Sequence, residues 1–368
     1  MAVGFLPALG GGIRALAETG QLSRLVDGYM RPYADAFGEV VYFSYLPESL
    51  ADFSKDRTLL ERVSVLAPPR PAPRGRRAVT MVGAHAAAFR RCRALRVFQI
   101  TGVIPALLAH ARFGVPYVTT YGFWYAQLSG PGPKRLLKSV VERLGLRYAA
   151  AVIATTEELR SQAARLARRV ELIPNGVDTR LFVPAPRPTR SESQRILYVG
   201  RLSAEKNLSA VVASGAYLEQ DVIFRLVGAG PLRQALEAQA RPLGVRVEFR
   251  GVVDQATLPA EYAASDVFVL ASFTEGHPKV LLEAMACGLP CVASDCAGNR
   301  SIVTHGETGL LFDPHDPRQL ADYVRQVLQD RDLARRLGQA GRALVAERYD
   351  LSALVQREIA LVRDVAGH

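Results

Sequence analysis

The chain has few of the features that mark membrane, secreted or disordered proteins. No apolar run in its 368 residues approaches the ~18 residues that a membrane-spanning helix needs. Residues 1–12 lack the charged start and the cleavage site of a signal peptide. Apolar residues make up 49% and charged residues 22%, which is typical of a globular protein. We therefore expect a cytoplasmic protein long enough for two domains.

Cysteine is also scarce, and recognisable metal-binding patterns are missing. The four cysteines, Cys92, Cys287, Cys291 and Cys296, lack the paired spacing of a zinc site. We expect buried, reduced thiols. The alternative is that Cys287, Cys291 and Cys296 bind a metal together with a histidine. Asp330-Arg-Asp332 has the spacing of an Asp-x-Asp metal motif but lies between two amphipathic segments, so we interpret it as a helix boundary. The sequence therefore predicts no metal.

Positive charge is unevenly distributed along the chain. Residues 1–175 contain 24 Lys and Arg against 12 Asp and Glu, whereas residues 176–368 contain 22 against 23. The basic residues gather in runs over residues 70–77, 90–96, 134–138 and 165–169. A basic first half can attract an anionic membrane surface, an anionic acceptor or nucleic acid. The alternative is that its basic residues only lie on solvated helix faces. Nucleic acid is the weakest choice, because no zinc finger, RNA-binding or helix-turn-helix pattern is present.

Short apolar runs alternate with helical stretches throughout, which indicates an α/β protein with parallel, doubly wound sheets. Turn chemistry at Pro174–Asp178 precedes a stretch rich in Pro, Ser and Arg. We therefore predict a Rossmann-like domain over residues 1–174, a linker over 175–194 and a second Rossmann-like domain over 195–349. Residues 350–368 are expected to return to the first domain. Such sheets bind ligands at the carboxyl ends of their strands, so two facing sheets would enclose a cleft.

The expected elements follow from this alternation. In the first domain the strands are Val3–Leu6, Val40–Tyr45, Val63–Leu66, Val97–Ile100, Val115–Thr120, Val152–Ala154 and Glu171–Ile173. In the second they are Ile196–Val199, Val222–Val227, Val245–Phe249, Val267–Leu270, Cys291–Ala293 and Gly309–Phe312. Helices are expected at Gln21–Ala36, Pro133–Tyr148, Glu157–Ala167, Asn207–Leu218, Pro231–Ala240, Lys279–Cys287, Asp316–Gln329, Asp332–Arg348 and Tyr349–Val365. Pro68–Arg77 contains four prolines and is expected to be a loop.

Two cations follow the first expected strand of the second domain. Gly200 permits a close turn, and Arg201 and Lys206 then occupy the strand's carboxyl end and the start of a helix. A departing diphosphate gains negative charge, and a fixed guanidinium and ammonium would stabilise it without a metal. A surface Arg and Lys near a turn are the alternative. Gly228 follows the next strand in a short Gly-x-Gly, which is either a close turn near a nucleotide or an ordinary tight turn.

The richest pattern lies between Ser272 and Asn299. Glu275 and Gly276 form a loop after an expected strand, and Glu283 lies about one turn inside the following helix. The two carboxylates are eight positions apart and could bind opposite ends of one nucleotide-sugar, the sugar hydroxyls and the ribose diol. The alternative is an acid at a helix start and a solvated helix charge.

The start of that helix is itself an expected anion site. Pro278 suits the first helical position, because its missing N–H costs nothing there. The free N–H groups of Lys279, Val280 and Leu281 would then face a ligand at the positive end of the helix dipole. Such a helix start commonly binds phosphate.

These segments resemble those of the family 4 retaining glycosyltransferases, which have the GT-B fold of two Rossmann-like domains. The matching strings are Ile173–Asp178, Tyr198–Asn207, Val227–Arg233, Glu275–Gly288, Gly298–Arg300 and Gly306–Leu311. Together they extend over most of the second half. Each string alone is unspecific, whereas the set is specific.

The resemblance implies a role for each matching residue. Arg201 and Lys206 would hold the donor diphosphate, and Glu275 would contact the donor sugar. The other residues implied in donor binding are Gly200, Gly228, Val252, Gly276, His277, Pro278, Lys279, Val280, Leu281 and Glu283. Among these, Val252 would contact the base and Glu283 the ribose. The family retains the anomeric configuration and needs neither metal nor cofactor.

The first half resembles the family more loosely. Gly11 and Gly12 follow the first strand, where the family often places a glycine loop near the donor phosphates; an ordinary flexible loop is the alternative. Many relatives carry His-Gly after the fifth strand, where this chain has Tyr121-Gly122. Tyr121 could donate a hydrogen bond on the acceptor or sugar side, but an unperturbed pKa near ~10 makes a tyrosine a poor base.

The leading hypothesis is a metal-independent, retaining glycosyltransferase. It would move a hexose or related sugar from a nucleotide-diphosphate-sugar to a polysaccharide, lipid-linked or small-molecule acceptor. Its basic first domain suggests peripheral association with the inner face of a membrane, without nucleic acid. The alternatives are a nucleotide-sugar epimerase on the same fold and a non-catalytic sugar-nucleotide sensor. The hypothesis requires that Arg201, Lys206 and the backbone near Val280 serve one site.

Overall fold

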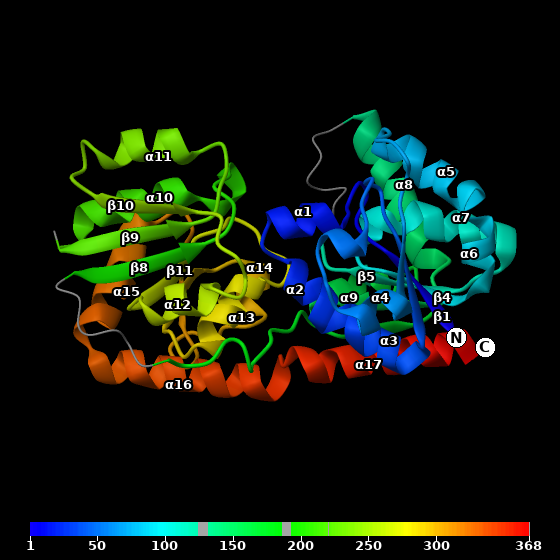
Figure 1. The fold of residues 1–368 in the computed structure, drawn as a ribbon. Helices are drawn as coiled ribbons and strands as arrows, with labels where there is room; N and C mark the ends of the chain where they lie inside the picture. The colour runs from blue at the N-terminus through cyan, green and yellow to red at the C-terminus, as the bar shows by residue number, and fades with distance from the viewer. Residues whose placement is uncertain (124–131, 186–192, 220, 368) are drawn as a thin grey trace. The chain divides into compact units, whose positions relative to one another are not determined.

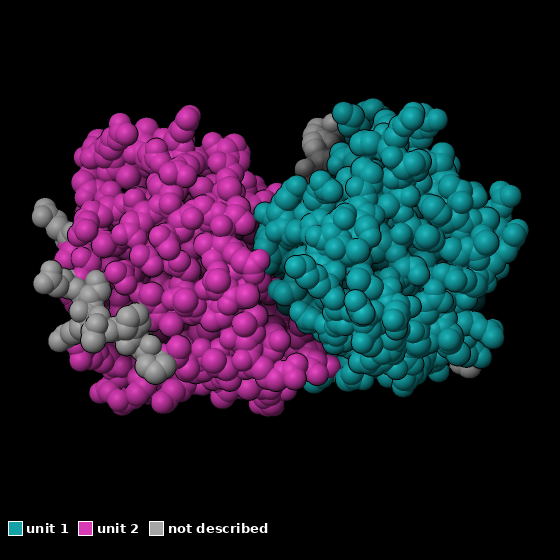
Figure 2. Space-filling model, in the orientation of Figure 1, with its two compact units in different colours: residues 1–174, 353–368 teal, residues 175–352 magenta. Residues whose placement is uncertain are grey.

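The computed structural model describes residues 1–123, 132–185, 193–219 and 221–367. The chain divides into two compact units, shown in different colours in Figure 2. Unit 1 contains residues 1–174 together with 353–368, and unit 2 contains residues 175–352. Over the described residues, none of the helices combines the length and the apolar character needed to span a bilayer.

Unit 1 is built on a seven-stranded sheet in the order β3-β2-β1-β4-β5-β6-β7, and all of its strand pairs are parallel. The strands are β1 (Ala2–Leu6), β2 (Glu39–Phe43), β3 (Val63–Leu66), β4 (Cys92–Val97), β5 (Tyr117–Tyr121), β6 (Ala151–Ala154) and β7 (Val170–Leu172). The strands from β2 to β6 in this order are largely buried by helices that lie between the strands in sequence, whereas the edge strands β3 and β7 are mostly half-buried (Figure 1). The predicted parallel α/β architecture is confirmed.

One strand of unit 1 was misplaced by the sequence pattern. The expected strand Val97–Ile100 is wrong, because β4 ends at Val97 and Ile100 begins the 3-10 turn η3 (Ile100–Gly102). Arg96 obscured the strand, since an arginine is not expected at a core position. Its guanidinium is only 2% exposed and is paired at 2.6 Å with Glu358 of the C-terminal helix.

The remaining helical elements of unit 1 lie around this sheet. They are α1 (Ile13–Glu18), α2 (Leu22–Leu25), η1 (Val26–Met30), α3 (Arg31–Phe37), η2 (Leu50–Asp52), α4 (Arg57–Arg62), α5 (Arg74–Ala84), α6 (Ala86–Arg91), α7 (Val103–Phe113), α8 (Pro133–Arg147) and α9 (Glu157–Ala163). The expected helix Gln21–Ala36 is divided into α2, a π-helical turn and α3. The expected loop Pro68–Arg77 ends early, because α5 begins directly after the last proline, Pro73.

The C-terminal helix α17 (Leu351–Gly367) belongs to unit 1 from residue 353 onward. Besides the buried Arg96–Glu358 pair, its Asp364 forms an ion pair with Arg169, and its Arg357 donates a hydrogen bond to the backbone oxygen of Leu172 at 2.8 Å. These contacts attach the end of the chain to β4 and β7.

Unit 2 contains a six-stranded parallel sheet in the order β10-β9-β8-β11-β12-β13. The strands are β8 (Gln194–Val199), β9 (Val222–Val227), β10 (Arg246–Gly251), β11 (Val267–Leu270), β12 (Cys291–Ser294) and β13 (Leu310–Phe312). In this order the chain leaves β8 toward one edge and β11 toward the other, so a topological switch point lies between β8 and β11.

The helical elements of unit 2 alternate with these strands. They are η4 (Ala204–Lys206), α10 (Leu208–Ser214), η5 (Gly215–Tyr217), α11 (Arg233–Ala240), α12 (Leu258–Ala263), α13 (Lys279–Ala286), α14 (Ala297–Arg300), α15 (Pro317–Gln329) and α16 (Arg331–Arg348). Asp330 is the N-cap of α16, where its carboxylate accepts a hydrogen bond from Leu333 N at 2.9 Å. The predicted helix boundary at Asp330-Arg-Asp332 is therefore confirmed.

The residues expected to form a linker are divided by the structure. Residues 175–185 belong to unit 2, where Val177 N donates to Tyr349 O and Leu351 N donates to Val177 O, both at 2.8 Å. Phe182 is fully buried in the core of this unit. Residues 186–192 of the expected linker lie outside the described residues.

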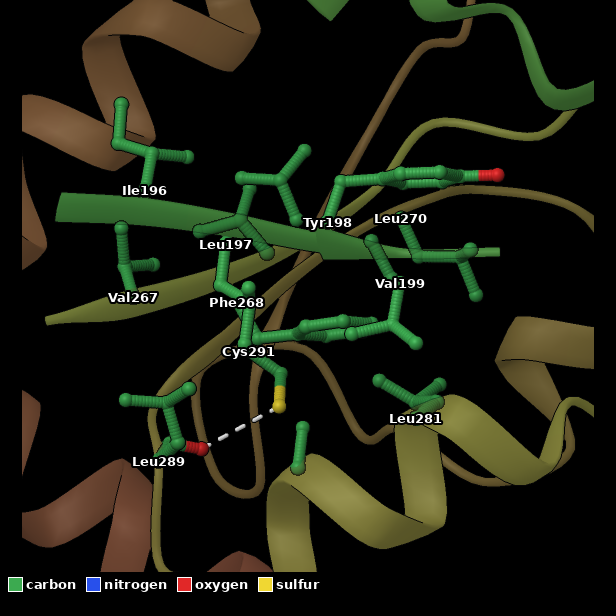
Figure 3. Close-up of a cluster of buried hydrophobic side chains, with 14 of the residues drawn as sticks. Ile196, Leu197, Tyr198, Val199, Val267, Phe268, Leu270, Leu281, Leu289 and Cys291 are labelled. Carbon is green, nitrogen blue, oxygen red and sulfur yellow. Dashed lines mark hydrogen bonds between the residues drawn. The ribbon is translucent and has the colours of Figure 1, made fainter. Parts of the chain in front are cut away.

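The core of unit 2 lies between the central strands and α13 (Figure 3). Leu197 and Phe268 pack side by side on β8 and β11, and Leu281 closes the cluster from α13. Cys291 donates a hydrogen bond to Leu289 O at 3.2 Å, and burial raises the pKa of its thiol. All four cysteines are free; Cys92, Cys291 and Cys296 are buried as predicted, whereas Cys287 is half-buried. In the part of the chain that the structure describes, no three His, Cys, Asp or Glu residues gather as a metal site.

Candidate active site

The candidate site lies at the carboxyl edge of the unit 2 sheet, at its switch point. Gly200 directly follows β8, and Ser272 is the second residue after β11. These two strands are adjacent in the sheet, so the segments that leave them begin close together. Ligands of doubly wound sheets bind at such a point.

Lys206 and Glu275 meet across the switch point. The Lys206 ammonium lies 2.6 Å from Glu275 Oε1, although the two residues are far apart in sequence. Their side chains are only 18% and 11% exposed. Ser272 Oγ donates a hydrogen bond to the same carboxylate oxygen at 2.6 Å. The alternative of an ordinary surface lysine and an isolated helix-start acid is wrong for this pair.

Arg201 is more open than Lys206. Its guanidinium is 77% exposed and contacts Glu205 Oε1 at 3.1 Å, and the same oxygen accepts a hydrogen bond from Ser203. The Ser203 hydroxyl, with smaller contributions from Arg201 and Lys206, lowers the pKa of Glu205. The two cations thus contact different carboxylates, Arg201 that of Glu205 and Lys206 that of Glu275, and Arg201 is the one that faces solvent.

A buried polar chain continues from Glu275 toward β12. Ser294 Oγ donates to the backbone oxygen of Ser272 at 2.6 Å, and the Asn299 amide donates to Ser294 O at 2.8 Å. A Cβ atom on Gly298 would lie 2.4 Å from Glu275 O, so only glycine permits this approach of α14 to the loop. The loop that carries Glu275 is thus held by buried hydrogen bonds.

The start of α13 follows this loop. Pro278 is the N-cap residue with an extended backbone, and Lys279 is the first helical residue, so the predicted first helical position for Pro278 is wrong by one residue. The shift places Val280 and Leu281 at the second and third helical positions. Their N–H groups belong to the first turn, which has no acceptor within its own helix. Helix α13 therefore begins four residues after Glu275, the acidic member of the Lys206–Glu275 pair.

His277 is buried under the same loop. Its ring centroid lies 5.3 Å from that of Tyr349, and its backbone oxygen accepts a hydrogen bond from the Asn175 amide at 2.7 Å. Burial lowers the pKa of His277 to about 3. The imidazole is therefore neutral at physiological pH and cannot supply a cation to a diphosphate. Its place in the site is that of a packed, neutral side chain beside Gly276.

Glu283 is buried on the inner face of α13. It is 1% exposed, and Tyr262 of α12 donates a hydrogen bond to its Oε2 at 3.0 Å. Burial, with a smaller contribution from Glu283, raises the pKa of Tyr262, so this hydroxyl keeps its proton. The alternative of a solvated helix charge is wrong for Glu283. Tyr262 instead fixes the direction of the carboxylate.

Glycine turns close the other side of the sheet edge. Gly228 has a φ of 129°, and a Cβ atom there would lie 1.9 Å from Gly200 O. The short Gly-x-Gly thus lets the turn after β9 pack against the turn after β8. Val252 follows β10 and is 53% exposed, which leaves an apolar side chain open to solvent beyond these turns.

The glycine loop of unit 1 is described separately. Gly12 is the N-cap of α1, and the next two backbone N–H groups, of Ile13 and Arg14, donate to the Glu48 carboxylate at 2.7 and 2.8 Å. Ser44 Oγ donates to the same carboxylate, which is buried. Gly11 precedes Gly12 and is bonded to Ala8 and Tyr45 through its backbone. The two amides that directly follow the glycine loop, which the resemblance places near the donor phosphates, are thus bonded to a protein carboxylate.

Tyr121 ends β5, and Gly122 follows it. The tyrosine is buried, and this burial, with a smaller contribution from Glu142, raises its pKa. Its hydroxyl therefore stays protonated and is an even weaker base than an exposed tyrosine.

Sequence reasoning missed several residues that shape these sites. Ser272 and Tyr262 hold the two glutamates, and Glu205 pairs with Arg201, while Glu48 caps the start of α1 in unit 1. Ser272 could have been found from its place just after an expected strand. The other three lie on elements whose pairing is not visible in local sequence.

The sequence models of two families match this chain, one over each half. The family described as Glycosyl transferases group 1 matches residues 182–344, and that described as Glycosyl transferase 4-like domain matches residues 23–176.

Proteins of known activity are similar to this chain in sequence. Alpha-maltose-1-phosphate synthase of Mycolicibacterium smegmatis is 29% identical over 295 residues, which cover 71% of this chain and 76% of that protein. This chain spans about half the length of several other curated relatives.

Solved structures share the fold. The sucrose-phosphate synthase of Thermosynechococcus elongatus superposes with a TM-score of 0.82 at 23% identity, covering 100% of this chain and 99% of the other. The Anabaena protein Alr3699/HepE, solved with UDP and glucose, gives a TM-score of 0.81 at 21% identity over 99% of this chain and all of that one. These structures show a fold of the GT-B type, and by the two family matches, over residues 23–176 and 182–344, the chain belongs to the group 1 glycosyltransferases.

Proposed function

We propose that this glycosyltransferase moves a sugar from a nucleotide-diphosphate-sugar to an acceptor with retention of the anomeric configuration, and that unit 2 binds the donor. One observation carries the proposal: Lys206 and Glu275 are paired at the switch point of unit 2, directly before the start of α13. A cation, a carboxylate and a helix start suit a diphosphate joined to a sugar.

The cations have distinct proposed tasks. Lys206, held by Glu275, is placed for one phosphate, and the more exposed Arg201 can swing from Glu205 to clamp the other. As the bond to the sugar breaks, negative charge grows on the leaving diphosphate, and two fixed cations stabilise that charge. The first turn of α13 adds the N–H groups of Val280 and Leu281. This set supplies the charge that other transferases obtain from a divalent cation.

The carboxylates are proposed to bind the two ends of the donor. Glu275 accepts hydrogen bonds from sugar hydroxyls once the ammonium of Lys206 turns to phosphate. Glu283, oriented by Tyr262, accepts from the ribose diol. Val252 is the proposed apolar contact for the base. Gly276, His277 and Pro278 shape the sugar pocket, and Lys279 adds positive charge at the helix start.

Unit 1 is the proposed acceptor unit, with Tyr121 and Gly122 on its acceptor side. Its basic character suits an acceptor that carries phosphate or another anion, including a lipid-linked or polysaccharide acceptor. UDP-sugars are the first donors to test, since the Anabaena structure was solved with UDP.

A thermal-shift screen tests the donor assignment, because a ligand that binds only the folded state raises the melting temperature. We expect at least one nucleoside diphosphate and its sugar conjugate to raise it, and the shift to be lost in Arg201→Ala and Glu275→Gln. Arg335→Ala is the matched control, since Arg335 lies on α16 and its guanidinium forms an ion pair with the local Asp332. A shift that survives in both site variants would refute the donor site.

Product analysis then tests the reaction. Transfer should continue in the presence of a chelator, and the product should keep the anomeric configuration of the donor. An inverted product, or transfer that stops on chelation and returns with a divalent cation, would contradict the mechanism. Release of a changed sugar nucleotide without any acceptor would identify an epimerase.

A further inference from the structure

Helix α8 (Pro133–Arg147) exposes an apolar stripe to solvent. Leu136, Leu137, Val140, Leu144 and the following Tyr148 are between 42% and 69% exposed. At about 100° per residue, these five side chains fall within about 120° of the helix circumference. Exposed leucines are common singly, but five large apolar side chains on one helix face mark an interaction surface.

The opposite face of α8 is the one that packs on unit 1. Gly145 approaches α7 so closely that a Cβ atom would lie 2.8 Å from a Val103 methyl group, and its backbone oxygen accepts a hydrogen bond from Tyr117 Oη at 2.8 Å. Leu146 and Glu142 are buried on this same side. Figure 1 shows α8, in blue-green, beside α7. The apolar stripe is therefore not the packed face of the helix.

The exposed charge on α8 is of one sign. Five exposed basic residues lie on the helix, namely Lys134, Arg135, Lys138, Arg143 and Arg147. The single acidic residue, Glu142, is buried on the packed side. An apolar stripe beside exposed Lys and Arg is the composition of helices that lie in the plane of an anionic membrane surface. A second copy of this chain would bring cations against cations, so charge complementarity favours lipid headgroups.

We propose that α8 binds the surface of an anionic lipid bilayer. The stripe from Leu136 to Tyr148 enters the boundary between headgroups and acyl chains. The basic residues contact lipid phosphates beside it. Binding by this surface is independent of the proposed sugar transfer, because it needs neither donor nor acceptor.

Flotation of the full chain with lipid vesicles tests this surface. Vesicles of phosphatidylcholine containing about 30% phosphatidylglycerol should bind the protein at least tenfold more tightly than phosphatidylcholine alone. Because exposed charges are screened by salt, raising the ionic strength from 0.05 to 0.5 M should weaken the binding by about tenfold or more. Equal binding to both kinds of vesicle would overturn the electrostatic part of the proposal.

Two variants separate the stripe from the charges. Lys134→Glu with Arg135→Glu should weaken binding to the anionic vesicles by about 100-fold or more, since each cation near the surface contributes about fivefold. Leu136→Ser with Leu137→Ser should weaken it by about tenfold or more at unchanged charge. Both pairs are exposed, so the melting temperature should stay close to that of the wild type. The matched control is Arg335→Glu with Arg336→Glu on α16, which makes the same charge change in unit 2. This variant should bind the anionic vesicles nearly as tightly as the wild type.

Other occupants give distinct results. Wild-type binding by both α8 variants would overturn the proposal. A concentration-dependent dimer in vesicle-free solution that dissociates in Leu136→Ser with Leu137→Ser would also overturn it and assign the stripe to a second copy of the chain.

Discussion

The two units follow the same strand order from their first to their sixth strand, yet they use the turn after the first strand differently. In unit 2 the turn after β8 leads to Arg201 and Lys206, and Lys206 pairs with Glu275 from the loop after the neighbouring strand β11. In unit 1 the turn after β1 leads to α1, whose first N–H groups are bonded to Glu48. Topology thus fixes where a ligand can bind, and side chains decide whether the place is open to an anion.

The largest expected effect contrasts the cations that follow the two turns. Lys206→Ala should reduce transfer by about 100- to 1,000-fold, because a stabilising charge at the developing diphosphate is lost. Arg14→Ala, an exposed cation after the unit 1 turn, should reduce it by less than about tenfold. The measurement is kcat/KM with the best donor of the thermal-shift screen. Equal losses in the two variants would remove the distinction between the units.

A second test removes the carboxylate that occupies the unit 1 turn. Glu48→Ala should lower the free energy of unfolding by about 2–4 kcal/mol, because a buried and a half-buried N–H group lose their acceptor. Glu48→Gln keeps one acceptor oxygen and should lose less. Urea unfolding measures both. If Glu48→Ala is as stable as the wild type and binds the donor more tightly, the unit 1 turn is an anion site that Glu48 merely covers.

The buried histidine of unit 2 predicts a pH dependence of stability. The pKa of His277 is about 3 in the folded protein, against about 6.5 for an unfolded histidine. The unfolded chain therefore binds more protons between these values, so stability is full above pH 6.5 and falls as the pH drops toward 3. The slope should be about 1.4 kcal/mol per pH unit.

His277→Gln isolates that contribution. The difference in unfolding free energy between wild type and variant should be constant above pH 7 and should shift in favour of the variant by about 1.4 kcal/mol per pH unit below 6.5. His110→Gln in unit 1 is the control, because that histidine is only half-buried and lies on α7, outside the loop that carries Glu275. A constant difference down to pH 5 would show that His277 is not held neutral.

The smallest expected effect concerns Tyr121. Because its buried hydroxyl keeps its proton, it cannot act as a base, and Tyr121→Phe should change kcat by less than about threefold. A loss near 100-fold with unchanged KM would instead assign the hydroxyl a direct role in transfer.

Much of the fold was readable because strands buried on both faces are continuous apolar runs. Val222–Val227 and Val267–Leu270 have the bounds that were predicted for them. Prediction failed where tertiary contacts override local pattern, as at β4, whose Arg96 is neutralised by Glu358 from the end of the chain. It also failed at Gln21–Ala36, where a π-helical turn interrupts a sequence with helical periodicity.

The alternating parallel architecture, the segments after β8 and β11 and the residue types that suit a diphosphate could be predicted from the sequence, since these depend on local pattern and spacing. Which charges meet could not be predicted, because it depends on how distant segments pack. The contacts that matter are between residues on different elements: Lys206 with Glu275, Glu283 with Tyr262, and Glu48 with the start of α1. The tertiary structure also decided that the leucines of α8 face outward, because burial depends on what packs against a helix and not on the helix alone.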